Sequence, residues 1–268
     1  MTENHTLAGP HGDGRIVVQE EGDPSAPVLV FLHSEFGAYD PLPLSEAVLA
    51  SRRVLQVHLP GWGVSTCDRP FGSLAEMSLA LWWALDALGV GRVSLFGHGI
   101  GGTVAAEMAA GQPQRVRAAT LVAPFGMFDE ENPGADVFGL LPRDLVPSVY
   151  ADPRGEVHAA HFPPPADAHE VGLATIRRVQ VLGEASNYLF PIPDTGIAAR
   201  LYRLAGVPVQ LLWGGLDGVV PPELEKLWVE HLPHAESTVL DGVSHMAPYE
   251  TPEVSAAMLD FQARAGVE

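Results

Sequence analysis

Residues 94–102 read Ser-Leu-Phe-Gly-His-Gly-Ile-Gly-Gly, and this stretch decides which fold the chain adopts. An apolar run ends here in closely spaced glycines, and small residues continue from Ile100 to Ala110. The pattern predicts a strand, a sharp turn and a helix that packs closely on the strand, because glycine allows such close backbone approach. Gly99 occupies the apex of this turn and carries no side chain.

On both sides of this turn, short β-branched or apolar runs alternate with longer helical patterns. This alternation is typical of a mostly parallel sheet with crossover helices. The predicted strands are Arg15–Gln19, Val28–His33, Val54–His58, Val93–Phe96, Ala118–Ala123, Val209–Trp213 and Ser237–Leu240. The predicted helices are Leu74–Leu88, Ile100–Ala110, Glu223–His231 and Pro252–Ala263.

The alternation fails between about Phe125 and Ala198, where prolines cluster. This interval is too long for a simple loop inside a compact domain. We therefore expect one α/β core, formed by residues 1–124 and 199–268, with residues 125–198 inserted as a mostly helical cap.

The charge and composition of the chain exclude several classes of partner. With 33 acidic and 15 basic residues, the net charge of -18 disfavours nucleic acid and anionic membrane surfaces. The single cysteine excludes an internal disulfide, and no apolar run approaches the ~20 residues that a spanning helix needs. The polar opening lacks the pattern of a signal peptide. We expect a cytoplasmic monomer or homodimer that takes a small-molecule substrate or ligand.

These features resemble the α/β-hydrolase superfamily, in particular its capped esterase and carbon–carbon bond hydrolase branches, over residues 15–265. That superfamily has a His-Gly oxyanion loop after an early strand, a Gly-x-Ser-x-Gly nucleophile turn, then an Asp and a His. The resemblance places the acid at Asp217, in Leu-Asp-Gly-Val-Val, and the base at His245, in Val-Ser-His-Met. An Asp that accepts from one imidazole nitrogen leaves the other nitrogen free to accept a proton.

Two positions depart from the pattern of that superfamily. Gly99 stands at the nucleophile position, so covalent serine catalysis from this turn is excluded. Glu35 stands in His-Ser-Glu-Phe-Gly, at the position whose backbone N–H would form the oxyanion hole together with that of Ile100. An ionised carboxylate there would oppose a developing oxyanion. Glu35 either points to solvent, or points inward with its pKa raised by burial and acts as an acid beside His245.

The resemblance also implies an apolar pocket between the cap and the Asp217–His245 pair. Its expected lining and oxyanion-loop residues are Ser34, Phe36, Ile100, Phe125 and Tyr188, with Asn187 as a further polar contact. His98 should pack behind the turn. His158, His161 and His169 lack a carboxylate or cysteine that would complete a known metal site. We expect neither a metal nor a cofactor.

Three functions fit this sequence. The first is an enzyme that uses His245, Asp217 and Glu35 in noncovalent acid–base chemistry on a small to medium apolar carbonyl compound. It would be a water-mediated hydrolase, a lyase, an isomerase or a cyclase. The second is a serine esterase or carbon–carbon bond hydrolase captured as an inactive Ser-to-Gly variant. The third is a non-catalytic small-molecule binding protein. The altered oxyanion loop, in a separate segment, favours the first over the second.

Overall fold

The computed structural model describes residues 3–10, 12–163 and 165–267. Residues 1–2, 11, 164 and 268, which the expected core and cap ranges include, lie outside the described residues. Within the described part of the chain, eight strands form one sheet in the order β1-β2-β4-β3-β5-β6-β7-β8. They are β1 (Glu3–Ala8), β2 (Arg15–Gly22), β3 (Val28–Leu32), β4 (Arg53–Val57), β5 (Val93–His98), β6 (Val116–Val122), β7 (Val209–Gly214) and β8 (Glu236–Leu240).

The sheet is mostly parallel, as the alternation of strands and helices predicts. Strands β4, β3, β5, β6, β7 and β8 run parallel to one another, while β2 pairs antiparallel with both β1 and β4. The central strands β3 and β5 are buried along almost their whole length because helices cover both faces of the sheet. All seven predicted strands are present within three residues at each end. The sequence reading missed β1, a polar edge strand that pairs with β2 and is largely exposed.

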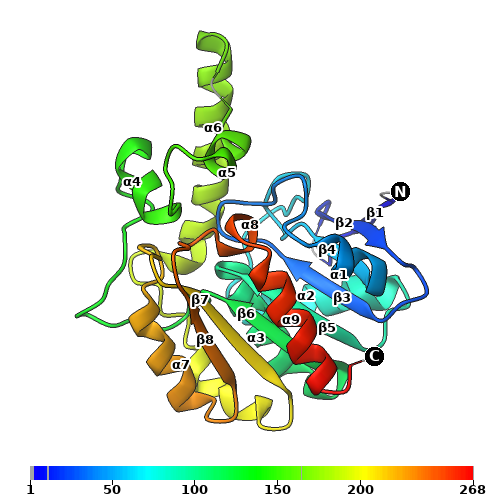
Figure 1. Ribbon diagram of the computed structural model, residues 1–268. Helices are drawn as coiled ribbons and strands as arrows, with labels where there is room; N and C mark the ends of the chain where they lie inside the picture. The colour runs from blue at the N-terminus through cyan, green and yellow to red at the C-terminus, as the bar shows by residue number, and fades with distance from the viewer. Residues whose placement is uncertain (1–2, 11, 164, 268) are drawn as a thin grey trace.

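Helices cover both faces of the sheet (Figure 1). On one face lie α2 (Leu74–Ala87) and α3 (Ile100–Gly111), and on the other lie α1 (Glu46–Ser51) and α9 (Glu253–Arg264). The other elements of the core are the 3-10 helices η1 (Pro113–Arg115), η2 (Ile197–Leu204) and η3 (Pro222–Leu224), with α7 (Glu225–His231) and α8 (Ala247–Glu250). Among the described residues, no helix combines the length and apolar character that a membrane span needs.

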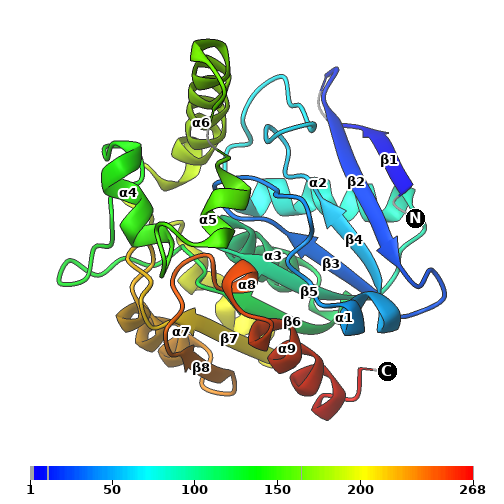
Figure 2. The same ribbon diagram turned by 45° about the horizontal axis from the view of Figure 1, so that its top comes forward.

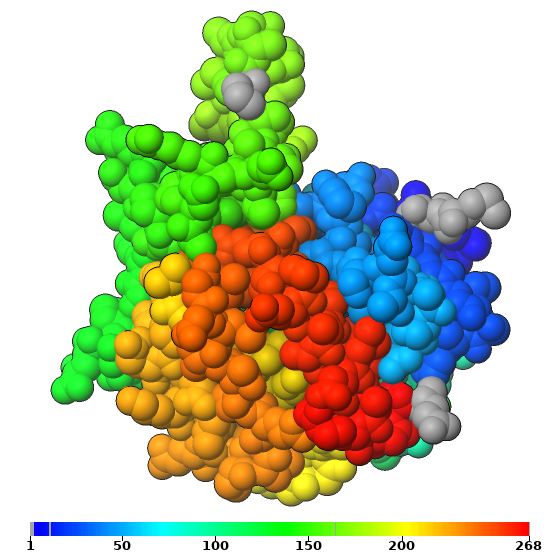
Figure 3. All heavy atoms as spheres, viewed as in Figure 1, coloured from blue at the N-terminus to red at the C-terminus, as the bar shows by residue number. Residues whose placement is uncertain are grey.

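The segment between β6 and β7 carries α4 (Pro142–Val149), α5 (Glu156–His161) and α6 (Ala168–Leu189). It is less helical than expected, because residues 125–141, with three glycines and one proline, form irregular chain. Its helices gather on the side of the sheet where α8 lies (Figure 2). One end of α6 stands clear of the body of the protein (Figure 3).

Backbone hydrogen bonds tie the end of α4 to the two loops that carry Asp217 and His245. The backbone N–H of Gly218 donates to the carbonyl oxygen of Ser148 at 3.0 Å, and that of Met246 donates to Val149 at 3.1 Å. The inserted segment therefore lies directly against the loops that the sequence singled out as catalytic.

Candidate active site

The turn between β5 and α3 has the sharp geometry that its glycines predict. Gly99 has φ 56° and ψ −123°, in the left-handed half of the backbone map. A Cβ on Gly97 would lie 2.2 Å from the carbonyl oxygen of Gly101, so a side chain there would prevent the close approach of strand and helix. The sequence Gly-His-Gly-Ile-Gly therefore forms a sharp strand-to-helix turn with no side chain at its apex.

Asp217 and His245 lie together at the ends of the strands. One carboxylate oxygen of Asp217, Oδ1, accepts from the backbone N–H groups of Val219 and Val220, both at 2.8 Å. The other, Oδ2, lies 2.9 Å from His245 Nδ1. This pairing assigns Nδ1–H as the donor to Asp217 and directs Nε2 of the buried ring toward the turn at Gly99.

Glu35 points inward and its side chain is completely buried. Its Oε1 lies 2.9 Å from Nε2 of His245, which makes an ion pair. The pair is not a well-aligned hydrogen bond, since neither atom has a hydrogen-bond partner among the described residues. A Cβ built on Gly99 would lie 2.3 Å from Glu35 Oε2. The carboxylate of Glu35 thus occupies the space that a side chain at position 99 would take, and the solvent-facing alternative is wrong.

The same carboxylate faces the backbone donors that would form an oxyanion hole. The N–H of Ile100 donates to Glu35 Oε2 at 3.4 Å, a long hydrogen bond. The backbone N–H of Glu35 itself also stabilises its own carboxylate. The N–H of Ile100 therefore contacts a carboxylate that the protein supplies, at the position where the sequence resemblance predicts an oxyanion hole.

Two side chains that the sequence analysis did not assign to the site, His33 and Trp62, hold the loop that aims Glu35. Burial lowers the pKa of His33 to about 3, so its ring is neutral. Its Nδ1 donates to the carbonyl oxygen of Ser34 at 2.7 Å, and its Nε2 accepts from the backbone of Leu59 at 3.0 Å. The indole of Trp62 donates to the carbonyl oxygen of Glu35 at 3.2 Å. One feature of the sequence could have indicated this contact. The glycine-containing turns that carry His33 and Trp62 follow β3 and β4, which are neighbouring parallel strands.

The charges of the site differ from the sequence-based expectation. Burial alone would lower the pKa of His245, but the carboxylates of Asp217 and Glu35 outweigh it and raise the pKa to about 10. Burial alone would raise the pKa of Glu35, but the His245 cation outweighs it and lowers that pKa below its ordinary value. The predicted role of Glu35 as a buried acid of raised pKa is therefore wrong. At neutral pH an imidazolium lies between two carboxylates.

His98 supports His245 from behind the turn. Burial lowers the pKa of His98 to about 3, which makes the ring neutral, and its Nε2 donates to the backbone carbonyl oxygen of His245 at 2.8 Å. The two ring centroids lie 4.9 Å apart. His98 therefore holds the His245 ring in position. Because His98 is neutral, it is not part of the charged row that Glu35, His245 and Asp217 form.

The structure brings some of the expected pocket residues to the site. Phe36 meets the His245 ring edge-on at 6.0 Å between centroids, and Phe125 lies 6.2 Å from it. Ser34 is buried beside Gly99, and its hydroxyl accepts from the backbone of Phe36 at 3.3 Å. These contacts make the surroundings of His245 apolar on the ring faces and edge.

Two other expected pocket residues lie elsewhere. The Tyr188 ring stacks on Trp62 at 6.3 Å between centroids, and its hydroxyl accepts from the backbone of Phe71 at 3.1 Å. Tyr188 therefore packs on Trp62, and Trp62 lies between the Tyr188 ring and the loop that carries Glu35. The amide of Asn187 donates to Glu184 on the exposed side of α6, so the expected substrate contact is not made.

The histidines of the inserted segment serve the packing of α5. His161 stacks on Tyr39 with 4.0 Å between centroids, and its Nδ1 lies 2.7 Å from the hydroxyl of Tyr150. His158 packs edge-on against Tyr150, while His169 is exposed on α6. Within the described ranges, no group of three or more His, Cys, Asp or Glu side chains is arranged to hold a metal ion.

The comparisons with known proteins agree with the fold. The family model described as the alpha/beta hydrolase family matches residues 29–258, which is most of the chain. The protein therefore belongs to the α/β-hydrolase family. A solved structure, a 2-hydroxy-6-oxo-6-phenylhexa-2,4-dienoate hydrolase from a Rhodococcus species, superposes with a TM-score of 0.72. It shares 20% sequence identity, and the alignment covers 98% of this chain and 100% of the other.

Two curated relatives mark the range of activities in this family. A 2-hydroxy-6-oxononadienedioate/2-hydroxy-6-oxononatrienedioate hydrolase of Burkholderia vietnamiensis is 28% identical over 80% of this chain and 78% of its own length. The dihydrolipoyllysine-residue acetyltransferase component of the acetoin cleaving system of Pseudomonas putida is 29% identical over 80% of this chain. The chain spans only 57% of the length of that relative.

The charged row predicts how stability depends on pH. Because the pKa of His245 is raised from 6.5 to about 10, its stabilising contribution is fully present below pH 6.5 and is lost as the pH rises through 10. We expect the free energy of unfolding, measured by urea denaturation, to fall between these values. The fall should be smaller in Glu35→Gln, where one of the two carboxylates is gone. Identical pH profiles for the two proteins would contradict the assignment of an imidazolium.

Proposed function

We propose that the protein is an enzyme that performs noncovalent acid–base chemistry on small to medium apolar carbonyl compounds, with no serine nucleophile. The observation that carries this proposal is the row of Glu35, His245 and Asp217. Both links of the row measure 2.9 Å, and the Glu35 carboxylate lies in the space beside Gly99. Proton transfer requires a base and an acid that lie side by side, and the Glu35 carboxylate and the His245 imidazolium form such a pair. The segment 125–198 serves as the cap over this site.

In the proposed reaction, Glu35 Oε2 accepts a proton from the carbon next to the substrate carbonyl. The electron pair of that C–H bond moves to the carbonyl oxygen, which becomes an enolate oxygen. The Nε2–H group of His245 donates a hydrogen bond or its proton to this oxygen, and Asp217 keeps the ring oriented through Nδ1. Return of the proton from Glu35 to another carbon completes an isomerisation, and expulsion of a leaving group completes a lyase reaction.

The substrate class follows from the charges of the site. A carboxylate whose pKa is lowered is a weak base, so it suits carbon acids whose proton is activated by a second carbonyl group. The two carboxylates and one imidazolium carry a net negative charge, which favours neutral substrates over anionic ones. Phe36 and Phe125 make the surroundings apolar. The 6-oxo group in the names of the dienoate and dienedioate hydrolases supports a carbonyl substrate, although those compounds are carboxylates and the proposed substrates are neutral.

A substrate must also gain access to the backbone donors. The Glu35 carboxylate is the free end of a flexible side chain, and its bond to the N–H of Ile100 is long, at 3.4 Å. A substrate oxygen would replace Oε2 against that N–H group, and the displaced carboxylate would then be free to act as a base. Because the carboxylate leaves the N–H of Ile100 when the substrate binds, its negative charge does not repel the developing enolate oxygen at that position.

The test is a panel of neutral apolar 1,3-diketones and matched p-nitrophenyl esters. In D₂O, we expect NMR to detect enzyme-catalysed deuterium exchange or conversion of diketones. The esters should remain intact, and mass spectrometry should detect no covalent adduct. An acyl adduct with ester turnover would contradict the proposal. Diketone binding without exchange or conversion would instead favour the non-catalytic binding protein.

A further inference from the structure

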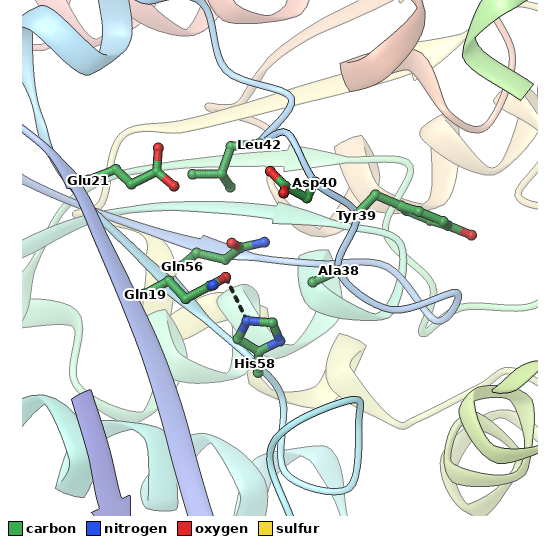
Figure 4. Close-up of a pocket in the computed structure, with 8 residues that line it drawn as sticks. All are labelled: Gln19, Glu21, Ala38, Tyr39, Asp40, Leu42, Gln56 and His58. Atoms are coloured by element: carbon green, nitrogen blue, oxygen red, sulfur yellow. Dashed lines mark hydrogen bonds between the residues drawn. The ribbon is translucent and has the colours of Figure 1, made fainter. Parts of the chain in front are cut away.

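A cavity lies between the sheet and the loop that follows β3 (Figure 4). It has a volume of about 210 Å³, which is below the range of sites for drug-sized molecules and therefore fits a small ligand. Its lining residues are Gln19, Glu21, Ala38, Tyr39, Asp40, Leu42, Gln56 and His58. None of them belongs to the Glu35–His245–Asp217 row, so this cavity is a separate site.

The amide of Gln56 is an unsatisfied donor at this cavity. Gln56 lies on β4 with only 3% of its surface exposed, and its Nε2 has no hydrogen-bond partner among the described residues. In Figure 4 this nitrogen points toward the loop residues Ala38 and Asp40. A buried donor without an acceptor carries a desolvation cost, which a ligand oxygen bound in the cavity would remove.

Two carboxylates line the cavity, and that of Asp40 gives it a negative charge. Glu21, on β2, and Asp40, on the loop, both line the cavity, and Figure 4 places them on its strand side and its loop side. The imidazole of His58 adds no positive charge, because burial lowers its pKa and its Nε2 bonds to Gln19 Oε1 at 2.8 Å. An anionic ligand would be repelled here, whereas a cation would be attracted.

These groups together define the chemistry of the ligand. The acidic and histidine side chains do not meet the arrangement of a metal site within the described ranges, so an organic cation fits better than a metal ion. We infer that the cavity binds a small organic ammonium compound that carries a hydroxyl or ether oxygen next to its charged nitrogen. The ammonium group pairs with Asp40, and the oxygen accepts a hydrogen bond from Gln56 Nε2.

Ethanolamine is the probe that tests this inference in the full-length protein. Propylamine has the ammonium group without the oxygen, and ethylene glycol has the oxygens without the charge. We expect isothermal titration at low ionic strength to give a dissociation constant for ethanolamine about fivefold below that of either analogue. Binding of ethanolamine that is no tighter than that of ethylene glycol would overturn the inference.

Two variants test the two proposed contacts separately, one at Gln56 and one at Asp40. Gln56→Leu should weaken ethanolamine binding to the level of propylamine and leave propylamine binding unchanged, because the donor serves only the oxygen. Its melting temperature should equal or exceed that of the parent protein, since the amide nitrogen has no partner to lose. Asp40→Asn should weaken both ammonium compounds, whereas Glu130→Gln, at an exposed carboxylate outside the cavity, should weaken neither. Unchanged ethanolamine binding in Gln56→Leu and Asp40→Asn would place the ligand elsewhere and contradict the inference.

Discussion

The Glu35→Gln variant is expected to lose about 10²–10⁴-fold in diketone proton exchange while it stays folded. Glutamine has nearly the same size and can still accept from Ile100, but its amide oxygen is far too weak a base to take a proton from carbon. The loss should fall on kcat more than on KM, because the carboxylate acts in the transition state and not in binding. Deuterium exchange followed by NMR, at several substrate concentrations, separates the two parameters.

A matched control for this variant is Ser94→Ala, which removes a buried polar group in the strand that leads to Gly99. The hydroxyl of Ser94 has no hydrogen-bond partner among the described residues, so its loss should leave both the fold and the exchange rate unchanged. Exchange at the parental rate in Glu35→Gln would show that Glu35 only fills space. The proposed base would then be wrong even if the protein were an enzyme.

The second large effect is a gain of function in the double variant Glu35→Gly with Gly99→Ser. Removing the carboxylate frees the space beside the turn and both backbone donors, and it lets the pKa of His245 fall so that its Nε2 can act as a base. The new serine would then have a histidine, an aspartate and an oxyanion hole. We expect hydrolysis of p-nitrophenyl esters to rise about 100-fold or more above the parent protein, with a burst and an acyl adduct.

The single variant Gly99→Ser is the informative control, because we expect it to remain inactive on esters. Its Cβ would lie 2.3 Å from Glu35 Oε2, so the carboxylate must move, yet its negative charge stays at the oxyanion hole. The positive φ of position 99 adds a backbone strain of about 1–3 kcal/mol for a residue other than glycine. Strong esterase activity in this single variant would mean that the protein is a serine hydrolase that lacks only its nucleophile.

The fold and the Asp217–His245 pair could be predicted from the sequence because they depend on local patterns. Continuous apolar runs identify strands that are buried on both faces, and the glycines at positions 97 and 101 identify a turn with no room for side chains at those two positions. Asp217 and His245 each follow a strand at the carboxyl edge of the sheet, so their meeting follows from chain order once the fold is known.

The orientation and charge of Glu35 could not be predicted in the same way. Its direction depends on contacts with His33 and Trp62, and Trp62 lies 27 positions away in the sequence. Its pKa depends on the balance between burial, which raises it, and the His245 cation, which lowers it. A sequence supplies the burial of a loop residue only roughly and supplies no distances. The placing of Tyr188 behind Trp62 escaped prediction for the same reason, since the inserted segment follows no regular pattern.

We propose that Glu35 takes the place of a nucleophile at position 99 and holds His245 as an imidazolium. An NMR titration of the ring nitrogens of His245, with selectively ¹⁵N-labelled histidine, tests it most directly. The account predicts that both nitrogens of His245 remain protonated at pH 8, that the ring titrates near the raised pKa of about 10, and that Glu35→Gln shifts this titration to lower pH. A His245 that titrates near its ordinary pKa of 6.5 in the parent protein, or at the same pH in both proteins, would contradict the account.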